Sequence, residues 1–186
     1  MGRSPSPDVL QRGHLREADW CLRGNRLCAH RSPRAYFSLV SRLGDGIAWY
    51  ALMAALILFD GRAGLFAAAH LAATGAIALA LYKALKHWTK RPRPFATDAR
   101  IRAWVAPLDE FSFPSGHTLH AVAFTLVAVA HYPPLAWVLL PFTASVAASR
   151  VVLGLHYPSD VLAASAIGMA LAMVSMRLAS GLSMLA

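Results

Sequence analysis

Three short polar clusters interrupt an otherwise apolar sequence and carry the residue types that can do chemistry. Together they supply three fixed cations, a hydroxyl, two imidazoles and a carboxylate, the set that phosphoryl transfer without a metal requires. The clusters are Lys86 with Arg93 and Pro94, then Pro114 to His117, and then Ser149 and Arg150 with His156 and Asp160.

Lys86, Arg93 and Arg150 are the cations that we expect to hold a phosphate. Planar guanidinium groups match the oxygens of a phosphoryl group, and a lysine adds a point charge. Basic residues near a helix end more often mark a membrane boundary. We apply that interpretation to the other basic residues around the first cluster: Lys83, Lys90, Arg91, Arg100 and Arg102.

The Pro-Ser-Gly-His sequence at 114–117 is typical of a turn that starts a helix. Ser115 is the expected N-cap, and Gly116 allows backbone amides to approach an oxyanion closely. His117 then lies in the first helical turn.

His156 and Asp160 stand four residues apart with Pro158 between them. The proline disfavours helix at the residue before it, so we expect His156 on an extended segment and Asp160 in the first turn of a helix. A carboxylate there can hydrogen-bond one imidazole nitrogen and leave the other free to attack phosphorus. The remaining histidines show no evident partner in the sequence, and we expect His120 to pack against His117 or tune it.

Five apolar segments predict an all-α, integral-membrane helical bundle of about five transmembrane helices. A turn at 60–62 makes a hairpin of the first and second apolar segments, and a turn at 133–134 makes a hairpin of the third and fourth. The long loop from 87 to 114 is expected to carry a short interfacial helix near 99–105. This order of crossings puts all three polar clusters on one membrane face. The apolar segments are 47–59, 63–82, 117–132, 135–149 and 161–179.

Residues 1–45 form a basic arm, and residues 46–186 form the predicted transmembrane phosphatase domain. The arm carries eight arginines and an amphipathic stretch at 8–30, with Trp20, Leu22 and Leu27 as expected membrane contacts. Five crossings put this arm on the same face as the clusters, and its positive charge predicts that the face is cytoplasmic.

Composition limits the partners of the chain. Its 57% hydrophobic residues and net charge of +9 favour anionic lipid headgroups and argue against nucleic acid. The two cysteines, Cys21 and Cys28, are expected to be reduced thiols, and we expect them to report the sidedness of the arm through labelling. The sequence shows no metal-binding spacing, so we expect no metal and no cofactor.

The three clusters resemble the signature of the type 2 phosphatidic acid phosphatases, the membrane branch of a superfamily that includes soluble bacterial acid phosphatases and vanadium haloperoxidases. Lys-x6-Arg-Pro fits 86–94, Pro-Ser-Gly-His fits 114–117, and Ser-Arg-x5-His-x3-Asp fits 149–160. The resemblance implies catalytic roles for His156 as nucleophile, Asp160 as its orienting partner and His117 as acid. It implies phosphate binding by Lys86, Arg93, Ser115, Gly116 and Arg150.

The resemblance predicts a metal-independent enzyme of the bacterial cytoplasmic (inner) membrane that hydrolyses a lipid phosphate through a phosphohistidine. Undecaprenyl diphosphate, phosphatidylglycerophosphate and phosphatidic acid are all candidate substrates. A lipid-to-lipid phosphotransferase and a non-catalytic lipid-binding membrane protein are the alternatives, and a haloperoxidase is disfavoured by the membrane character. The family places its site on the periplasmic face, whereas the arginine-rich arm here predicts the cytoplasmic face. Oligomeric state does not follow from the sequence.

Overall fold

The computed structural model describes the backbone of residues 7–183 and the side chains of residues 17–180. Arg3 and the side chains of Arg12 and Arg16, which belong to the predicted basic arm, lie outside this part. The described residues contain helices and no strand, which confirms the all-α prediction. The elements are α1 (Pro7–Leu27), α2 (Arg31–Arg42), the π-helical segment η1 (Leu43–Ile47), α3 (Ala48–Thr89), α4 (Pro94–Thr97), α5 (Gly116–His131), the 3-10 turn η2 (Pro133–Leu135), α6 (Ala136–Val152) and α7 (Pro158–Ser183).

Helix α3 is two helices joined at a sharp bend. Gly61 has φ 52° and ψ −120°, a conformation that lets the chain reverse there, so the first two predicted spans form a hairpin as expected. Three stretches are long and apolar enough to cross a membrane, namely Arg31–Thr97, which contains both limbs of α3, Pro133–Val152 and Pro158–Ser180. Helix α5, with 16 residues, is shorter, about 24 Å.

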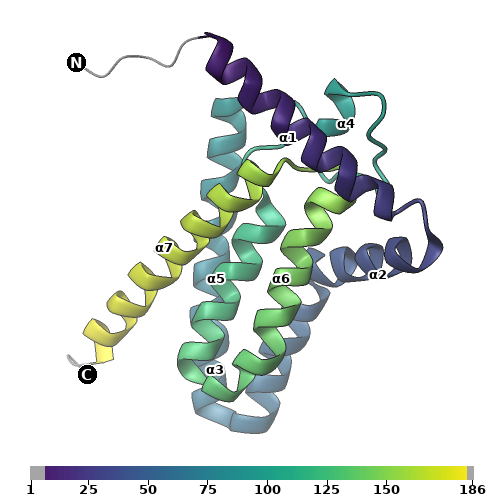
Figure 1. The fold of residues 1–186 in the computed structure, drawn as a ribbon. Helices are drawn as coiled ribbons and strands as arrows, with labels where there is room; N and C mark the ends of the chain where they lie inside the picture. Colours follow the sequence, from purple (N-terminus) through teal and green to yellow (C-terminus); the bar gives the residue numbers. More distant parts are fainter. Residues whose placement is uncertain (1–6, 184–186) are drawn as a thin grey trace, which may run out of the picture.

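Helix α5 forms the centre of the bundle and packs against α3, α6 and α7 (Figure 1). The core includes Trp49, Leu71, Phe124, Val127 and Val146, contributed by both limbs of α3, by α5 and by α6. Close packing of large and small apolar side chains around α5 fixes the relative positions of the helices that carry the polar clusters.

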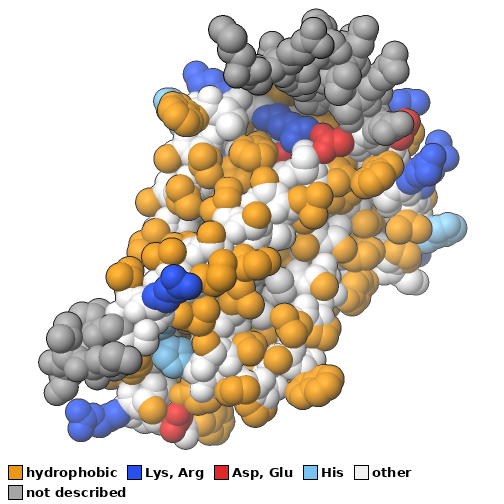
Figure 2. Space-filling view, turned by 60° about the vertical axis from the view of Figure 1, so that its left-hand side comes forward, with side chains coloured by type: hydrophobic (Ala, Val, Ile, Leu, Met, Phe, Trp, Pro, Cys, Tyr) orange, Lys and Arg blue, Asp and Glu red, His pale blue; other side chains and the backbone are white. Residues whose placement is uncertain are grey.

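The outside of the bundle is apolar in its middle region. Figure 2 shows hydrophobic side chains over this region and lysine and arginine side chains gathered mainly toward its two ends. Leu58, Phe59, Trp137 and Leu162 are each at least 70% exposed, which a water-facing surface would not tolerate in such number. This surface fits the hydrocarbon of a bilayer.

The loop between α3 and α5 differs from the prediction. Its one helical turn is α4, which begins at Pro94, and no helix forms at 99–105. The Asp98 carboxylate instead accepts hydrogen bonds from the backbone and side chain of Arg100 in a tight turn, and Trp104 N–H donates to the Leu153 carbonyl at 3.2 Å. The bond from Trp104 to the distant Leu153 carbonyl holds the loop against the end of α6.

Helix α1 crosses the end of the bundle at which the three polar clusters meet (Figure 1). Its inner face is buried there: Asn25 donates to the carbonyls of Val152 and Arg102 at 3.1 and 2.9 Å. Trp20 and Leu27 are exposed, as expected of membrane contacts, but Leu22 packs against buried residues of the chain. The arm therefore docks on the helical bundle through one face, and the membrane contact of the other face stays a prediction.

Candidate active site

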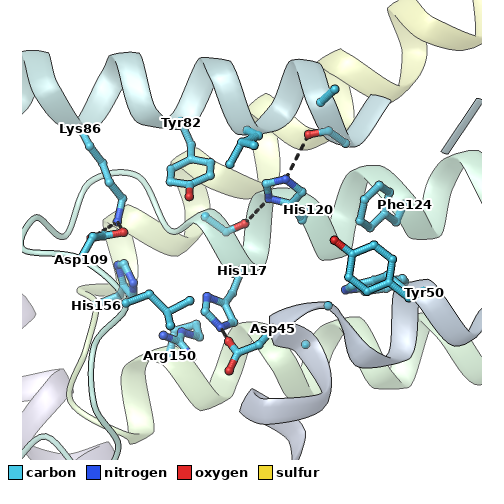
Figure 3. A pocket seen from close by; sticks show the side chains of 18 of the residues that line it. Asp45, Tyr50, Tyr82, Lys86, Asp109, His117, His120, Phe124, Arg150 and His156 are labelled. Atoms are coloured by element: carbon cyan, nitrogen blue, oxygen red, sulfur yellow. Dashed lines mark hydrogen bonds and ion pairs between the residues drawn. The ribbon is translucent and has the colours of Figure 1, made fainter. Parts of the chain in front are cut away.

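A cavity of about 470 Å³ opens where the polar clusters converge. Its polar end is lined by Lys86, Arg93, Arg150, His117 and His156, which come from α3, α5, α6 and two loops. The structure thus brings residues that are up to 70 positions apart in sequence into one site (Figure 3). The other end of the cavity is apolar, with walls from both limbs of α3 and from α5: Trp49, Met53, Ala72, Ala76, Leu79 and Phe124.

Lys86 and Arg93 share one carboxylate, that of Asp109 in the long loop. Lys86 Nζ donates to the two carboxylate oxygens at 2.5 and 2.7 Å, and Arg93 Nη2 donates to Oδ1 at 2.7 Å. Burial opposes the ionised form of Asp109, but the hydrogen bonds and charges of Lys86 and Arg93 outweigh it and lower the pKa of the carboxyl. Asp109 therefore pairs with two of the three cations that the sequence predicts to bind phosphate.

Arg150, unlike Lys86 and Arg93, has no carboxylate partner in the part of the chain that the structure describes and can therefore still bind an anion. It is buried, its Nη1 donates to Ser41 Oγ at 2.5 Å, and its Nε has no hydrogen-bond partner among the described residues. No carboxylate of the described part lies within ion-pair distance of it. A buried guanidinium that faces a cavity without a counter-ion is a ready anion site.

The tautomer of His156 follows from its neighbour. Arg93 Nη1 lies 3.2 Å from His156 Nε2, and a guanidinium can only donate, so Nε2 is the acceptor and its lone pair faces the cationic cluster. The proton of the neutral ring is then on Nδ1. Burial, followed by the charges of Arg150, Arg93 and Lys86, lowers the pKa of His156 well below its usual value. The imidazole is therefore kept neutral, the form that can act as a nucleophile.

Asp160 lies beside His156, but the contact is longer than predicted. Its Oδ2 is 3.6 Å from His156 Nδ1, outside hydrogen-bond range, and accepts instead from Tyr157 N–H at 2.8 Å. Helix α7 does begin at Pro158, as expected, which puts Asp160 in its first turn. The orienting role of Asp160 thus stays a prediction, which requires a small closure of the Nδ1–Oδ2 distance.

Arg91 has a different role from the membrane-boundary role that its position indicated. Its guanidinium donates to Asp160 Oδ1 at 2.7 Å and to Glu17 Oε2 at 2.6 Å, and it stacks on the Tyr157 ring at 4.2 Å. Glu17 also accepts from Ser159 N–H at 3.2 Å. Arg91 and Glu17 therefore join the N-terminal arm to the segment that carries His156 and Asp160.

The second cluster starts α5 as predicted. Ser115 is the N-cap, with its Oγ accepting from Thr118 N–H at 3.4 Å and from the Thr118 hydroxyl at 3.0 Å. Gly116 and His117 line the cavity, whereas Ser115 is fully buried behind its wall. His117 Nε2 hydrogen-bonds the carboxylate of Asp45, a residue of η1.

Other histidines have partners that the sequence did not reveal. The ring nitrogens of His120 lie 2.9 Å from the Gly116 carbonyl and 3.3 Å from the Gly75 carbonyl, so His120 links α5 to α3. His70 and His131, expected to be unpartnered, lie 3.0 Å apart and share a hydrogen bond.

Both cysteines are free thiols, as predicted, and both are fully buried. Cys21 Sγ lies 3.6 Å from the His156 carbonyl, and burial, together with the nearby carboxylates of Asp160 and Glu17, raises the pKa of its thiol to about 12. The expectation that these cysteines would report the sidedness of the arm is therefore wrong, because neither thiol is accessible in the folded protein.

Comparison with known proteins assigns the family. The model of the PAP2 superfamily matches residues 67–183, which contain all three polar clusters. The chain belongs to the PAP2 superfamily. This PAP2 protein is 38% identical over 78 residues to phosphatidylglycerophosphatase B of Escherichia coli K12, and an equal match is found in Shigella flexneri. The match covers 37% of the chain and 29% of the relative, so the chain spans less than a third of the length of the curated relatives it matches.

Two solved structures share the fold of this PAP2 protein. A transmembrane PAP2 type phosphatidylglycerolphosphate phosphatase from Bacillus subtilis superposes with a TM-score of 0.73 at 21% identity and covers 95% of this chain and 89% of its own. LpxE from Aquifex aeolicus superposes with a TM-score of 0.69 at 24% identity and covers 80% and 87%. Both share the helical fold of this chain, and the first is a transmembrane protein, in agreement with the predicted integral-membrane bundle.

Sequence reasoning missed Asp45, Asp109, Glu17 and Arg91. Acidic residues are scarce in this chain, nine against eighteen lysines and arginines, and that scarcity was the available signal. An aspartate between two glycines at the start of a membrane span, and another at the end of the long loop, are costly at a membrane boundary without a partner.

Proposed function

We propose that this PAP2 protein is a membrane lipid phosphatase that releases phosphate from a lipid monophosphate or diphosphate. The observation that carries the proposal is the cavity whose cationic end holds His156 and whose other end is walled by apolar side chains of α3 and α5. A headgroup phosphate fits the first end, and the beginning of a lipid tail fits the second.

The geometry supports a two-step reaction. His156 Nε2 attacks phosphorus, forming an N–P bond as the bond from phosphorus to the leaving oxygen breaks, and His117 gives that oxygen a proton. Water then attacks the phosphohistidine, its proton returns to His117, and the N–P bond breaks. Lys86, Arg93 and Arg150 stabilise the transferring phosphoryl group through their positive charge, so the reaction as proposed runs without a metal.

The site is proposed to face the cytoplasm of a bacterial inner membrane. Helix α1, which carries four arginines of the arm, lies across the end of the bundle that holds the cavity, and α2, which carries three more, lies below it beside α6 (Figure 1). The opposite end, at the Gly61 bend and η2, carries few basic residues in comparison. The positive-inside rule then favours a cytoplasmic site. The substrate would be a lipid phosphate exposed on that leaflet, and the names of the curated relatives make phosphatidylglycerophosphate a leading candidate.

Phosphate release by the purified protein in detergent tests the proposal. The panel contains phosphatidylglycerophosphate, phosphatidic acid and undecaprenyl diphosphate, and His156→Ala is the matched inactive control. Release from at least one lipid by the wild type and none by the variant is expected. Product analysis in water alone and with an added acceptor lipid separates hydrolysis from phosphotransfer. Absence of release from every lipid and from an activated aryl phosphate contradicts the proposal.

A further inference from the structure

Asp45 carries the carboxylate that hydrogen-bonds His117, the proposed general acid. It is the central residue of Gly44-Asp45-Gly46, and its Oδ1 hydrogen-bonds Nε2 of His117 (Figure 3). We propose that Asp45 is a positioning residue that fixes the orientation of His117 and stabilises its protonated ring, so that His117 can deliver a proton to the leaving oxygen. The inference rests on the proposed function.

The backbone around Asp45 is built to make this contact. Residues Leu43–Ile47 form a π-helical turn, and Gly46 has φ 139°, a conformation that disfavours any residue with a side chain. A Cβ at Gly44 would stand 3.2 Å from the Val146 side chain, so this backbone lies tightly against α6. Such π-helical turns are frequent at functional sites, and this one turns the side chain of a span-initiating residue into the cavity.

The bond decides which nitrogen of His117 is free. A carboxylate can only accept, so the Nε2 atom of His117 carries a hydrogen that points to Asp45. The proton that is transferred must then sit on Nδ1, which requires a ring protonated at both nitrogens. Since His117 lines the cavity, the second proton is available to a bound substrate.

The two histidines of the site need opposite protonation states. His156 must be neutral to attack, and it faces Arg93 while its carboxylate partner stays out of hydrogen-bond range. His117 must carry an extra proton, which burial and the positive charge of Arg150 oppose; the titratable groups around it are Arg150, His120 and His156 besides Asp45. Asp45 is the single negative group of this set, and an opposite charge in contact favours the imidazolium form.

Asp45→Asn tests the inference because it keeps the shape of the side chain and removes the charge. The probes are dioctanoyl phosphatidic acid, whose alkoxide leaving group needs a proton, and 4-nitrophenyl phosphate, whose leaving group does not. The loss cannot exceed that of removing a general acid altogether, about 10²- to 10⁴-fold. We expect kcat to fall about 10- to 100-fold on the lipid and less than about 3-fold on the aryl ester.

Two further variants exclude a structural explanation. Asp45→Glu is expected to recover most of the activity on the lipid, and in a His117→Ala background Asp45→Asn is expected to add no further loss. Asp98→Asn, which removes an equal charge from the exposed Asp98–Arg100 pair, is the matched control and should leave both rates unchanged.

Each outcome bears on a different claim. An equal loss on both probes, or an additive loss in the His117→Ala background, overturns the role of Asp45. A wild-type protein that hydrolyses neither probe contradicts the proposed function instead. If Asp45→Asn does not fold, the ratio of the two rates is measured for Asp45→Ala, which also removes the carboxylate and must lower the rate on the lipid more than the rate on the aryl ester.

Discussion

We expect Asp109 to compete with the substrate for Lys86 and Arg93, two of the three cations proposed to bind phosphate, and we expect the removal of its charge to tighten anion binding. In the structure its carboxylate accepts from Lys86 at 2.5 and 2.7 Å and from Arg93 at 2.7 Å. A phosphate that binds these cations must displace the carboxylate. Because the pKa of Asp109 lies below its ordinary value, the carboxylate stays ionised, and the competition persists, at neutral pH.

The free-energy cost of displacing Asp109 depends on how far its contacts with Lys86 and Arg93 are buried. Hydrogen bonds between charged groups contribute about 1.5–3 kcal/mol each when they are shielded from water. The Asp109 side chain is 35% exposed, so solvent screening reduces this value, and the incoming phosphate remakes the contacts of the cations. A net displacement cost of about 1–2 kcal/mol remains, which corresponds to about 5- to 30-fold in affinity.

The assay is competitive inhibition by inorganic phosphate and by vanadate, with 4-nitrophenyl phosphate as substrate. Asp109→Asn is expected to lower both inhibition constants about 5- to 30-fold. Its backbone carbonyl still accepts from Arg93 Nε at 3.0 Å, so the loop should stay in place. Glu110→Gln, an exposed neighbour with the same change in charge, is the control and should change neither constant. Unchanged or weaker inhibition of Asp109→Asn would refute the competition and show that Asp109 instead preorganises the two cations.

Three further predictions follow from the same geometry. Asp160→Asn should lower kcat and, because it also removes the buried partner of Arg91, lower the free energy of unfolding by about 2 kcal/mol, measured by thermal melting. Phosphate release should survive EDTA and be inhibited by vanadate, and a loss that magnesium restores would contradict the metal-free mechanism. Ala29→Cys, in the exposed turn after α1, should resist an impermeant thiol reagent in sealed spheroplasts, whereas Arg62→Cys at the opposite end should react. The wild type, whose two thiols are buried, gives the background labelling. The reverse pattern would put the site outside.

The helical order and the convergence of the polar clusters were predictable because they depend on local features. Apolar runs of span length, the turn at Gly61 and the Pro-Ser-Gly-His helix start are readable from neighbours in sequence, and the parity of the crossings then puts the clusters at one end. The structure adds the depth of each residue: Gly116 lines the cavity, but its neighbour Ser115, whose Oγ caps the helix by accepting from Thr118, does not.

The partners of the proposed catalytic residues were not predictable, because each comes from a distant segment. Asp45 reaches His117 across 72 positions, and Glu17 reaches Arg91 across 74. Neither contact leaves a periodic pattern, and both depend on how α1 and η1 dock against the bundle. The amphipathic pattern of the arm was visible, yet its apolar face has two possible partners, lipid and protein, and composition does not distinguish them.

The central claim is that His156 Nε2 forms a bond to phosphorus, and trapping the phosphoenzyme tests it most directly. Wild-type protein is mixed with 4-nitrophenyl phosphate, quenched in base within the first turnover, digested and analysed by mass spectrometry. We expect a base-stable, acid-labile phosphate on the peptide that contains His156, absent from His156→Ala. Phosphate on a different residue, or full turnover by His156→Ala, would contradict it.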